Sequence, residues 1–357
     1  MRKTKKEKGI ALNIIILACT IALFFVAFEI TVRSILGPGR IEDREGNPAY
    51  INDDELGVKL KPNFRGYFKE IDFNTRFNTN SLGYRSYEFD NTNRSIIFML
   101  GDSFVAGSGV EENETVVYQL EKKLNGWYKV YNLGVPGYSQ RQHVKQLEKL
   151  LPVYKPRVVI EHIYLGNDLT DNCDEQPKID KNITTYEGMK RIIKKSQAFI
   201  FLYRKIVVPF KYPKNLDFYI NDPDTEKCYE LTKEYLADIK RLTRDFNTRL
   251  IVTFIGREPQ TVKSKEEELI KWYDNFEKYK NNKDTFDLNL VNKKMKDICD
   301  NLGLSCFDLT PVFREYDGKK ILYLKDGHWN SEGHAFAAEE LAKYLNTREA
   351  TEEDGRG

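Results

Sequence analysis

The sequence lacks an excess of charge of either sign. Its 357 residues include 56 basic and 54 acidic side chains, so the formal net charge is only +2. Basic residues cluster at the start, where the first eight residues carry a net +4 and leave about −2 for the remainder. A body so close to neutral argues against a nucleic-acid-binding surface as its main function.

Metal-binding and phosphate-binding signatures are also missing. The four histidines and five cysteines form no Cys-x-x-Cys motif and no clustered spacing, so the sequence predicts no metal site. No Gly-Lys-Ser/Thr follows the glycines at Gly107 and Gly109, which argues against a phosphate-binding loop there. With 41% hydrophobic and 13% aromatic residues, the chain is not disordered. We expect a globular protein that needs no cofactor.

Cysteine usage is compatible with an oxidising compartment but does not decide the matter. Cys19 lies in an apolar run, and an even number of cysteines remains, at Cys173, Cys228, Cys299 and Cys306. Four cysteines allow three pairings. Order along the chain weakly favours Cys173 with Cys228 and Cys299 with Cys306, and four free buried thiols are an equally open alternative.

Residues 10–30 are almost continuously apolar, interrupted mainly by Asn13, Thr20 and Glu29. This is the length that a helix needs to cross a bilayer, roughly 20 residues. The run is too long for the apolar part of a signal peptide, and residues 26–29 make a poor cleavage site. A cleaved signal peptide and a buried soluble helix remain the alternatives.

The flanking charges set the expected orientation. Five cations precede the apolar run and only Arg33 follows it closely, which predicts a cytoplasmic N-terminus. We therefore predict a basic cytoplasmic tail at residues 1–9 and a transmembrane anchor at 10–36. The protein would be a single-pass protein of the cell membrane, with its body outside the cytoplasm.

The body divides by composition. Residues 37–94 are polar and aromatic with frequent turn signals, and we interpret them as an extension of short strands and loops. The main domain is expected at 95–346, with an insertion over the site at about 173–233. The charged, glycine-bearing stretch at 347–357 is expected to be a disordered tail.

Short apolar runs alternate with helical patterns along the main domain. The runs cover residues 95–100, 129–133, 157–164, 249–255 and 304–308. This alternation predicts an α/β fold with a mostly parallel five-stranded sheet, a flavodoxin-like three-layer α/β/α sandwich. In such sheets ligands bind beyond the carboxyl ends of the strands, so the loops there are where a site is expected.

Three of those loops carry polar or glycine signals. Ser103 follows the first strand in a Gly-Asp-Ser turn, where it is well placed as an exposed nucleophile. Gly137 follows the second strand, and a glycine lets a backbone N–H face a pocket. Asn167 follows the third, and its amide could donate to an oxyanion. Each signal alone is more typical of an ordinary turn or cap.

The fourth signal is a histidine two residues after a carboxylate. In an extended chain such positions point the same way, so Asp326 can orient His328 while the other ring nitrogen takes a proton from serine. Asp308 is the alternative carboxylate. The other histidines are interpreted as structural: His162 in a buried strand, with His143 and His334 at the beginnings of helices. His334 is the alternative base.

Taken together, the order and context of these residues resemble the SGNH (GDSL-type) hydrolase superfamily over roughly residues 95–345. The resemblance implies a nucleophile at Ser103 and an oxyanion hole of Ser103, Gly137 and Asn167. An Asn-Ser-Leu-Gly-aromatic-Arg element at 80–85 is similar to that of membrane-anchored members. Many members have Asp-x-x-His-Pro, whereas this chain has the shorter Asp-x-His-Trp that is similar to polysaccharide O-acetyl esterases and acyltransferases.

We therefore expect an extracytoplasmic serine esterase that hydrolyses O-acyl esters, with O-acetyl as first choice, on a glycan or a lipid. His328 would act as general base and then as general acid. An O-acyltransferase using the same residues and a non-catalytic glycan-binding or assembly protein are the alternatives. The membrane is the other expected partner, nucleic acid is not, and the sequence does not give the oligomeric state.

Overall fold

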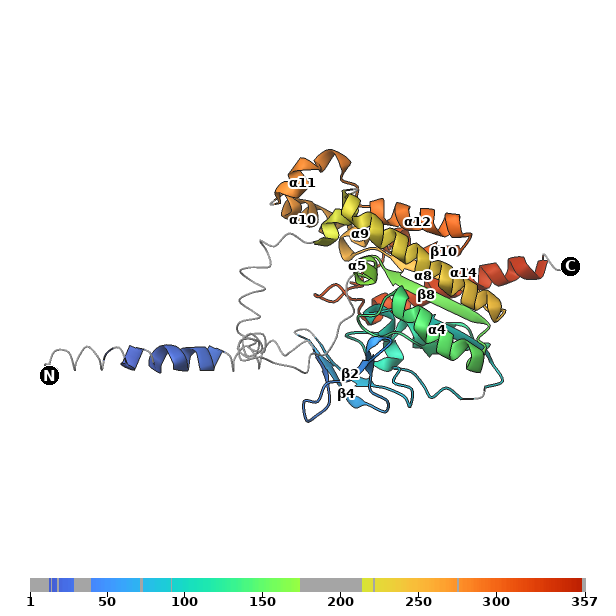
Figure 1. Ribbon diagram of the computed structural model, residues 1–357, viewed down its shortest axis with the longest axis horizontal. Helices are drawn as coiled ribbons and strands as arrows, with labels where there is room; N and C mark the ends of the chain where they lie inside the picture. The colour runs from blue at the N-terminus through green and yellow to red at the C-terminus, as the bar shows by residue number, and fades with distance from the viewer. Residues whose placement is uncertain are drawn as a thin grey trace. The chain divides into compact units, whose positions relative to one another are not determined.

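The computed structural model describes residues 13, 15–17, 19–28, 40–70, 73–90, 92–173, 214–220, 222–274 and 276–354 (Figure 1). The chain forms two compact units. The larger unit comprises Ile41–Phe68, Asp72–Ile179 and Tyr212–Gly357, and it contains every predicted site residue.

The N-terminal apolar run falls in the smaller unit. Its described residues, at 13, 15–17 and 19–28, are helical. In the described part of the chain, no helix combines the length and the apolar character needed to cross a membrane. The remainder of the predicted anchor and the whole predicted tail at 1–9 lie outside the described residues.

A five-stranded parallel sheet forms the centre of the larger unit, in the order β10-β9-β8-β6-β7. Its strands are β6 (Ser95–Leu100), β7 (Tyr128–Asn132), β8 (Val158–Tyr164), β9 (Arg249–Ile255) and β10 (Ser305–Asp308). Each begins and ends within one residue of its sequence prediction. The prediction succeeds because strands of a covered parallel sheet are short, uninterrupted apolar runs.

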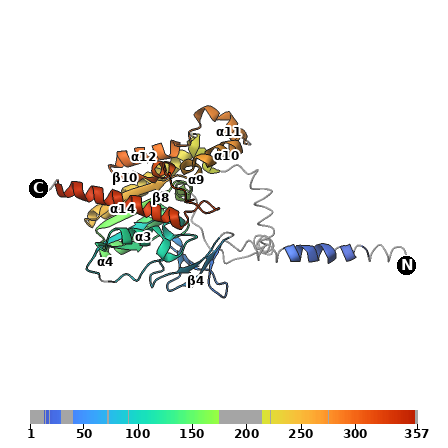
Figure 2. The ribbon, with the colours of Figure 1, turned by 180° about the vertical axis from the view of Figure 1, so that it is seen from behind.

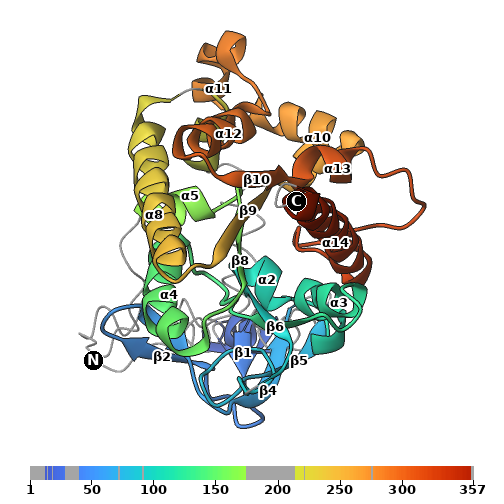
Figure 3. The same ribbon diagram turned by 90° about the vertical axis from the view of Figure 1, so that its right-hand side faces the viewer.

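Helices cover both faces of this sheet, which confirms the three-layer prediction (Figure 3). One face packs against α4 (Gln140–Tyr154), α8 (Glu226–Asp245) and α12 (Leu290–Leu302). The other packs against α3 (Val116–Lys123), α13 (Leu309–Arg314) and α14 (Ser331–Asp354), and α3 and α14 also contact each other (Figure 2).

Alternate strand residues supply the two cores. On β6, for example, Phe98 and Leu100 face α4 and α8, whereas Ile97 and Met99 face α3 and α14, and all four side chains are fully buried. A strand that is apolar at every position can be buried on both faces, which is why these runs show no polar alternation.

Shorter helices connect these elements. They are α2 (Ser103–Ala106), α5 (Asp168–Cys173), α9 (Glu258–Thr261), α10 (Lys263–Tyr273) and α11 (Glu277–Asn281). Both α2 and α5 begin directly beyond the carboxyl end of a strand, the edge of the sheet at which a site is expected.

The residues before β6 form two small sheets. The strands are β1 (Arg40–Glu42), β2 (Tyr50–Asp53), β3 (Gly57–Leu60), β4 (Arg65–Lys69) and β5 (Asn74–Asn78). The order β1-β4-β5 makes one sheet and β2-β3 the other. Their shared core includes Val135 and Tyr138 from the loop after β7, so the extension packs on the main domain.

The structure differs from the sequence prediction at two boundaries. Helix α8 begins at Glu226, inside the stretch 173–233 that was expected as an insertion, and residues 174–213 of that stretch lie outside the described ones. Helix α14 continues to Asp354, where a disordered tail was expected from Thr347. Both segments are rich in charged residues, and this polarity concealed their helices.

Two disulfides join helices to their neighbours. Cys173 at the end of α5 is bonded to Cys228 in α8, and Cys299 in α12 is bonded to Cys306 in β10. This is the pairing favoured by order along the chain, and the alternative of four free thiols is not observed.

Candidate active site

The predicted nucleophile lies in the turn that joins β6 to α2. Gly101 leaves no room for a side chain, because a Cβ there would lie 2.4 Å from the Val105 side chain. The buried Asp102 carboxylate accepts the backbone N–H of Phe104 at 2.9 Å and caps the short helix. Ser103 thus stands at the carboxyl end of an inner strand, with its hydroxyl 3.2 Å from that carboxylate.

The predicted base and its carboxylate lie in a tight loop before α14. Gly327 has a φ of +90°, the left-handed region that favours glycine. The backbone N–H of Leu324 donates to the carbonyl of His328 at 2.8 Å and closes the loop. One carboxylate oxygen of Asp326 accepts the backbone N–H of His328 at 3.1 Å. The loop therefore fixes this carboxylate beside the imidazole.

The structure brings these two segments together. His328 Nε2 lies 2.9 Å from Ser103 Oγ, and His328 Nδ1 lies 2.8 Å from the second carboxylate oxygen of Asp326. Ser103 and His328 are 225 residues apart in the sequence. The carboxylate accepts the Nδ1–H, so Nε2 is free to accept the serine proton, which is the arrangement of a serine-hydrolase triad.

Electrostatics favour an ionised carboxylate in this triad. Burial alone would raise the pKa of Asp326, but the hydrogen bonds and charge of His328 outweigh burial and hold that pKa below its ordinary value. An ionised Asp326 stabilises the imidazolium that forms when His328 accepts a proton. The side chains of His328 and Asp326 remain 25% and 29% exposed, so substrate and water can reach them.

A family model agrees with this geometry. The model of the GDSL-like Lipase/Acylhydrolase family matches residues 99–336, about two thirds of the chain. The chain belongs to this family. The resemblance to SGNH (GDSL-type) hydrolases is confirmed, and so is the prediction of an enzyme that acts on ester bonds as a serine hydrolase.

Solved structures are similar to this chain at low sequence identity, and no curated protein matches this chain. TesA is 13% identical, with 70% of this chain and 98% of that chain covered and a TM-score of 0.40. The acetyl xylan esterase AlAXEase is 12% identical, with 70% and 99% covered and a TM-score of 0.41. The lipase/acylhydrolase from Enterococcus faecalis is 14% identical, with 71% and 96% covered and a TM-score of 0.38.

The two other predicted oxyanion donors of this GDSL-like chain follow the strands on either side of β6. Gly137 follows β7 and Asn167 follows β8. Gly137 has a φ of +85° and open space where a Cβ would stand, so its backbone conformation rather than crowding requires glycine. Asn167 Nδ2 donates to Asp171 Oδ2 at 2.6 Å. An amide has two N–H donors, so one remains for an oxyanion.

The N-terminal extension holds the loop that carries Gly137. The hydroxyl of Tyr50 donates to the carbonyl of Pro136 at 3.1 Å, and the hydroxyl of Tyr138 donates to the carbonyl of Val58 at 2.7 Å. The residues on both sides of Gly137 are thus tied to the β2-β3 hairpin. The extension is part of the scaffold of the site, a role that composition did not reveal.

Trp329 is a site residue that the sequence analysis did not assign. Its side chain is fully buried and stacks on Phe313 with ring centroids 5.3 Å apart. Phe104, directly after the nucleophile, contacts both Trp329 and His328, with centroids at 5.0 and 5.2 Å. The tryptophan of the Asp-x-His-Trp motif therefore anchors in the core the exposed loop that carries Asp326 and His328, which we call the base loop. The only sequence signal for this role was the position of Trp329 directly after the histidine.

The arginine of the 80–85 element also contacts the nucleophile segment, a role that the sequence alone did not reveal. The guanidinium of Arg85 is buried and donates to the carbonyls of Ala106, Gly107 and Val110 at 2.6–3.0 Å, and to Arg76 at 2.7 Å. A cation beside the last carbonyls of a helix satisfies groups that the helix leaves unpaired. Arg85 thus fixes the end of α2, three residues after Ser103.

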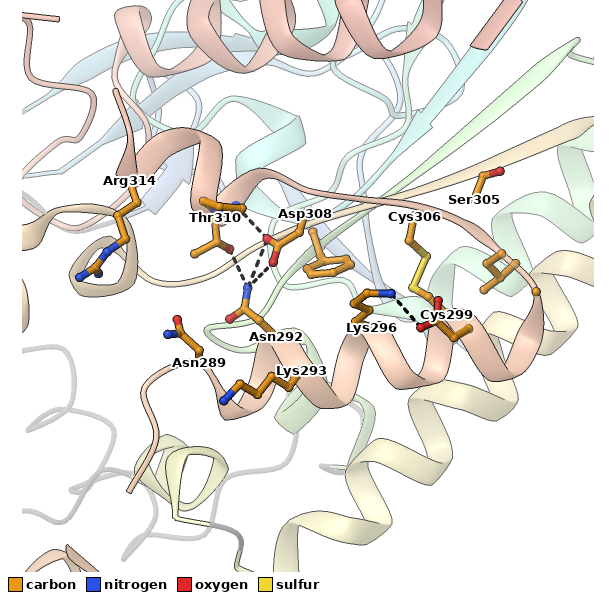
Figure 4. Close-up of a pocket in the computed structure, with 15 residues that line it drawn as sticks. Asn289, Asn292, Lys293, Lys296, Cys299, Ser305, Cys306, Asp308, Thr310 and Arg314 are labelled. Atoms are coloured by element: carbon orange, nitrogen blue, oxygen red, sulfur yellow. Dashed lines mark hydrogen bonds and ion pairs between the residues drawn. A yellow bond between two sulfur atoms is a disulfide. The ribbon is translucent and has the colours of Figure 1, made fainter. Parts of the chain in front are cut away.

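The alternative site residues lie elsewhere. His334 is buried, and its Nδ1 accepts the backbone N–H of Val116 at 3.1 Å, so it is not the base that contacts Ser103. Asp308 lines a separate cavity of about 780 Å³ between α12, β10 and α13, where it accepts hydrogen bonds from Asn292 and Thr310 (Figure 4). Asp326 is the carboxylate that contacts His328.

Proposed function

We propose that this chain is an extracytoplasmic serine esterase that hydrolyses O-acyl esters, with O-acetyl as first choice, on a glycan or a lipid. The observation that carries the proposal is the continuous hydrogen-bonded chain from Ser103 Oγ through His328 to Asp326. Its three side chains already lie at hydrogen-bond distance from one another, so no rearrangement is needed. The nucleophile is partly exposed.

The reaction follows from this geometry. Ser103 Oγ attacks the ester carbonyl while His328 Nε2 takes its proton, and the new C–O bond makes a tetrahedral oxyanion. The backbone N–H groups of Ser103 and Gly137 and the Asn167 amide are assigned to that oxyanion. His328 then protonates the leaving alcohol, an acyl-serine forms, and water activated by the same imidazole releases the acid.

Substrate class and location have separate support. The short Asp-x-His-Trp loop is similar to that of polysaccharide O-acetyl esterases and acyltransferases, which favours a glycan. The two disulfides favour an oxidising compartment, and the apolar run at 10–30 favours membrane attachment with the body outside the cytoplasm. Fractionation tests the attachment: full-length protein in the soluble fraction would contradict it.

Covalent labelling tests the catalytic assignment. A fluorophosphonate probe should modify the wild-type protein at Ser103, as read by peptide mass spectrometry, and leave Ser103→Ala unlabelled. Ser108→Ala is the matched control, because it removes a nearby buried hydroxyl that has no partner in the described residues. A folded wild-type protein that resists the probe would instead support a non-catalytic glycan-binding role.

Product analysis separates hydrolysis from transfer. Acetate released from an acetylated polysaccharide, equal in amount to the esters lost, supports the esterase. An acyl group recovered on an added polysaccharide acceptor supports the O-acyltransferase. Both reactions pass through the same acyl-serine, so inactivity of Ser103→Ala alone does not distinguish them.

A further inference from the structure

A fully buried histidine–glutamate pair lies behind the turn of the nucleophile. His143 in α4 and Glu161 in β8 have no exposed side-chain surface, and His143 Nδ1 lies 2.7 Å from Glu161 Oε1. The other ring nitrogen lies 3.3 Å from the carbonyl of Gly101, two residues before Ser103. The triad does not use this pair, and the position of His143 near a helix start predicted only a structural role.

The hydrogen-bonding chemistry of the pair determines which atoms donate and which accept. A carbonyl can only accept, so His143 Nε2 carries the hydrogen that points to Gly101. One further proton lies between Nδ1 and Glu161, whichever of the two groups holds it. The Gly101 carbonyl also accepts the backbone N–H of Val135 at 3.1 Å. Donors on two sides thus fix the peptide plane that leads into the nucleophile turn.

The same network reaches the turn of the oxyanion asparagine. Gln140 Nε2 donates to Glu161 Oε1 at 3.1 Å and to Asp168 Oδ2 at 3.3 Å. Asp168 Oδ2 in turn accepts the backbone N–H of Tyr164 at 3.1 Å, which closes the turn around Asn167. Both Gln140 and Asp168 are fully buried. One polar network therefore contacts the ends of β6 and β8.

We infer that His143, held by Glu161, is a positioning residue for the nucleophile turn, and that Gln140 and Asp168 extend this support to the turn of Asn167. The inference rests on the proposed function. Its consequence is that the Ser103 hydroxyl and the oxyanion donors keep their relative positions when the ester carbonyl becomes tetrahedral. Misplacement of a reacting group by about 1 Å can cost roughly 10²-fold in rate.

The test compares variants that keep or remove the donor to Gly101. His143→Leu removes it, and we expect kcat to fall by about 10–10²-fold with little change in KM. A glutamine at 143 can present an N–H at the reach of Nε2, and the proton between position 143 and Glu161 can then bond to the amide oxygen of that glutamine. Glu161 Oε1 still accepts from Gln140 Nε2 in this variant. His143→Gln should therefore recover most of the kcat lost in His143→Leu, a rescue that a space-filling role would not produce.

Thr248→Val is the matched control for lost stability. It removes one buried hydrogen bond, from the Thr248 hydroxyl to the carbonyl of Pro156 at 2.8 Å, at the opposite end of the same sheet. We expect this variant to lower the melting temperature and leave kcat per labelled serine unchanged. If His143→Leu behaves in the same way, or if a folded His143→Gln variant recovers nothing, the inference is wrong.

Amide hydrogen exchange gives a readout that does not depend on turnover. Exchange in the segment 99–106 should be faster in His143→Leu than in the wild-type protein and in Thr248→Val. Unchanged exchange there would overturn the inference. Absence of esterase activity in the wild-type protein would contradict the proposed function, and the exchange result would still decide whether His143 positions the turn.

Discussion

The two halves of the triad are held in different ways. The nucleophile turn is fixed by buried, distant partners, with Arg85 at the end of α2 and His143 behind Gly101. The base loop is exposed and closed by its own backbone, and Trp329 anchors it in the core. On the nucleophile side, we therefore expect a substitution that lowers stability to lower kcat as well. On the base side, we expect a substitution to change kcat with little change in stability.

The largest expected effect tests that separation in the base loop. Asp326→Asn favours the wrong imidazole tautomer, and for a serine-protease triad this change costs about 10⁴-fold in kcat. Ser103→Ala and His328→Ala should be similarly severe, and the losses should not add because the three residues act as one unit. Steady-state kinetics on an activated ester measures the loss, and the melting temperature should stay unchanged.

Asp317→Asn is the control for this prediction. It makes the same carboxylate-to-amide change at an exposed position before the base loop and should leave kcat intact. If Asp326→Asn keeps near-wild-type activity, the assignment of the triad carboxylate is wrong. If it unfolds the protein, the base loop is not separable from the scaffold and the comparison fails.

Asn167→Ala should have the next largest effect. Loss of one oxyanion donor costs on the order of 10²–10³-fold in kcat. Asp171→Asn should cost less, because it removes the charge that orients the Asn167 amide at 2.6 Å and leaves the donor in place. Kinetics of both variants and of the double variant measure this order, and additive losses would show that Asp171 does not act through Asn167.

Arg85→Leu tests whether the segment that carries the nucleophile depends on its distant partners for stability. The substitution leaves four carbonyls without their charged donor, and each hydrogen bond to a charged group is worth roughly 1.5–3 kcal/mol. We expect the free energy of unfolding to fall by at least about 3 kcal/mol, measured by urea denaturation, and kcat to fall with it. A stable variant with normal kcat would show that α2 needs no distant support.

The smallest expected effect concerns pH. Burial lowers the pKa of both His162 and His334 from 6.5 to about 3. Between those values the unfolded chain binds protons that the folded chain does not, so stability should fall as the pH drops from 6.5 toward 3. Each histidine contributes at most about 1.4 kcal/mol per pH unit. Melting temperatures of the wild-type protein and of His162→Gln at pH 7.5 and 5.5 measure the slope, which should be shallower in the variant.

Much of the fold and the triad could be predicted from the sequence because the signals are local. The strands are short apolar runs, and each candidate site residue lies directly after a strand or before the last helix. The carboxyl ends of parallel strands meet at one edge of the sheet, so order along the chain was enough to predict that Ser103, Gly137 and Asn167 lie at that edge. The Asp326–His328 contact is likewise set within three residues.

Only the tertiary structure decided what supports these groups. Arg85 donates to carbonyls about 20 residues away, and His143 reaches Gly101 across 42 residues. Neither contact has a periodic or spacing signal, because backbone carbonyls are present at every residue and only packing selects which one lies opposite a buried donor. Local sequence determined which residues reach the active edge, and packing between distant elements decided how rigidly each is held there.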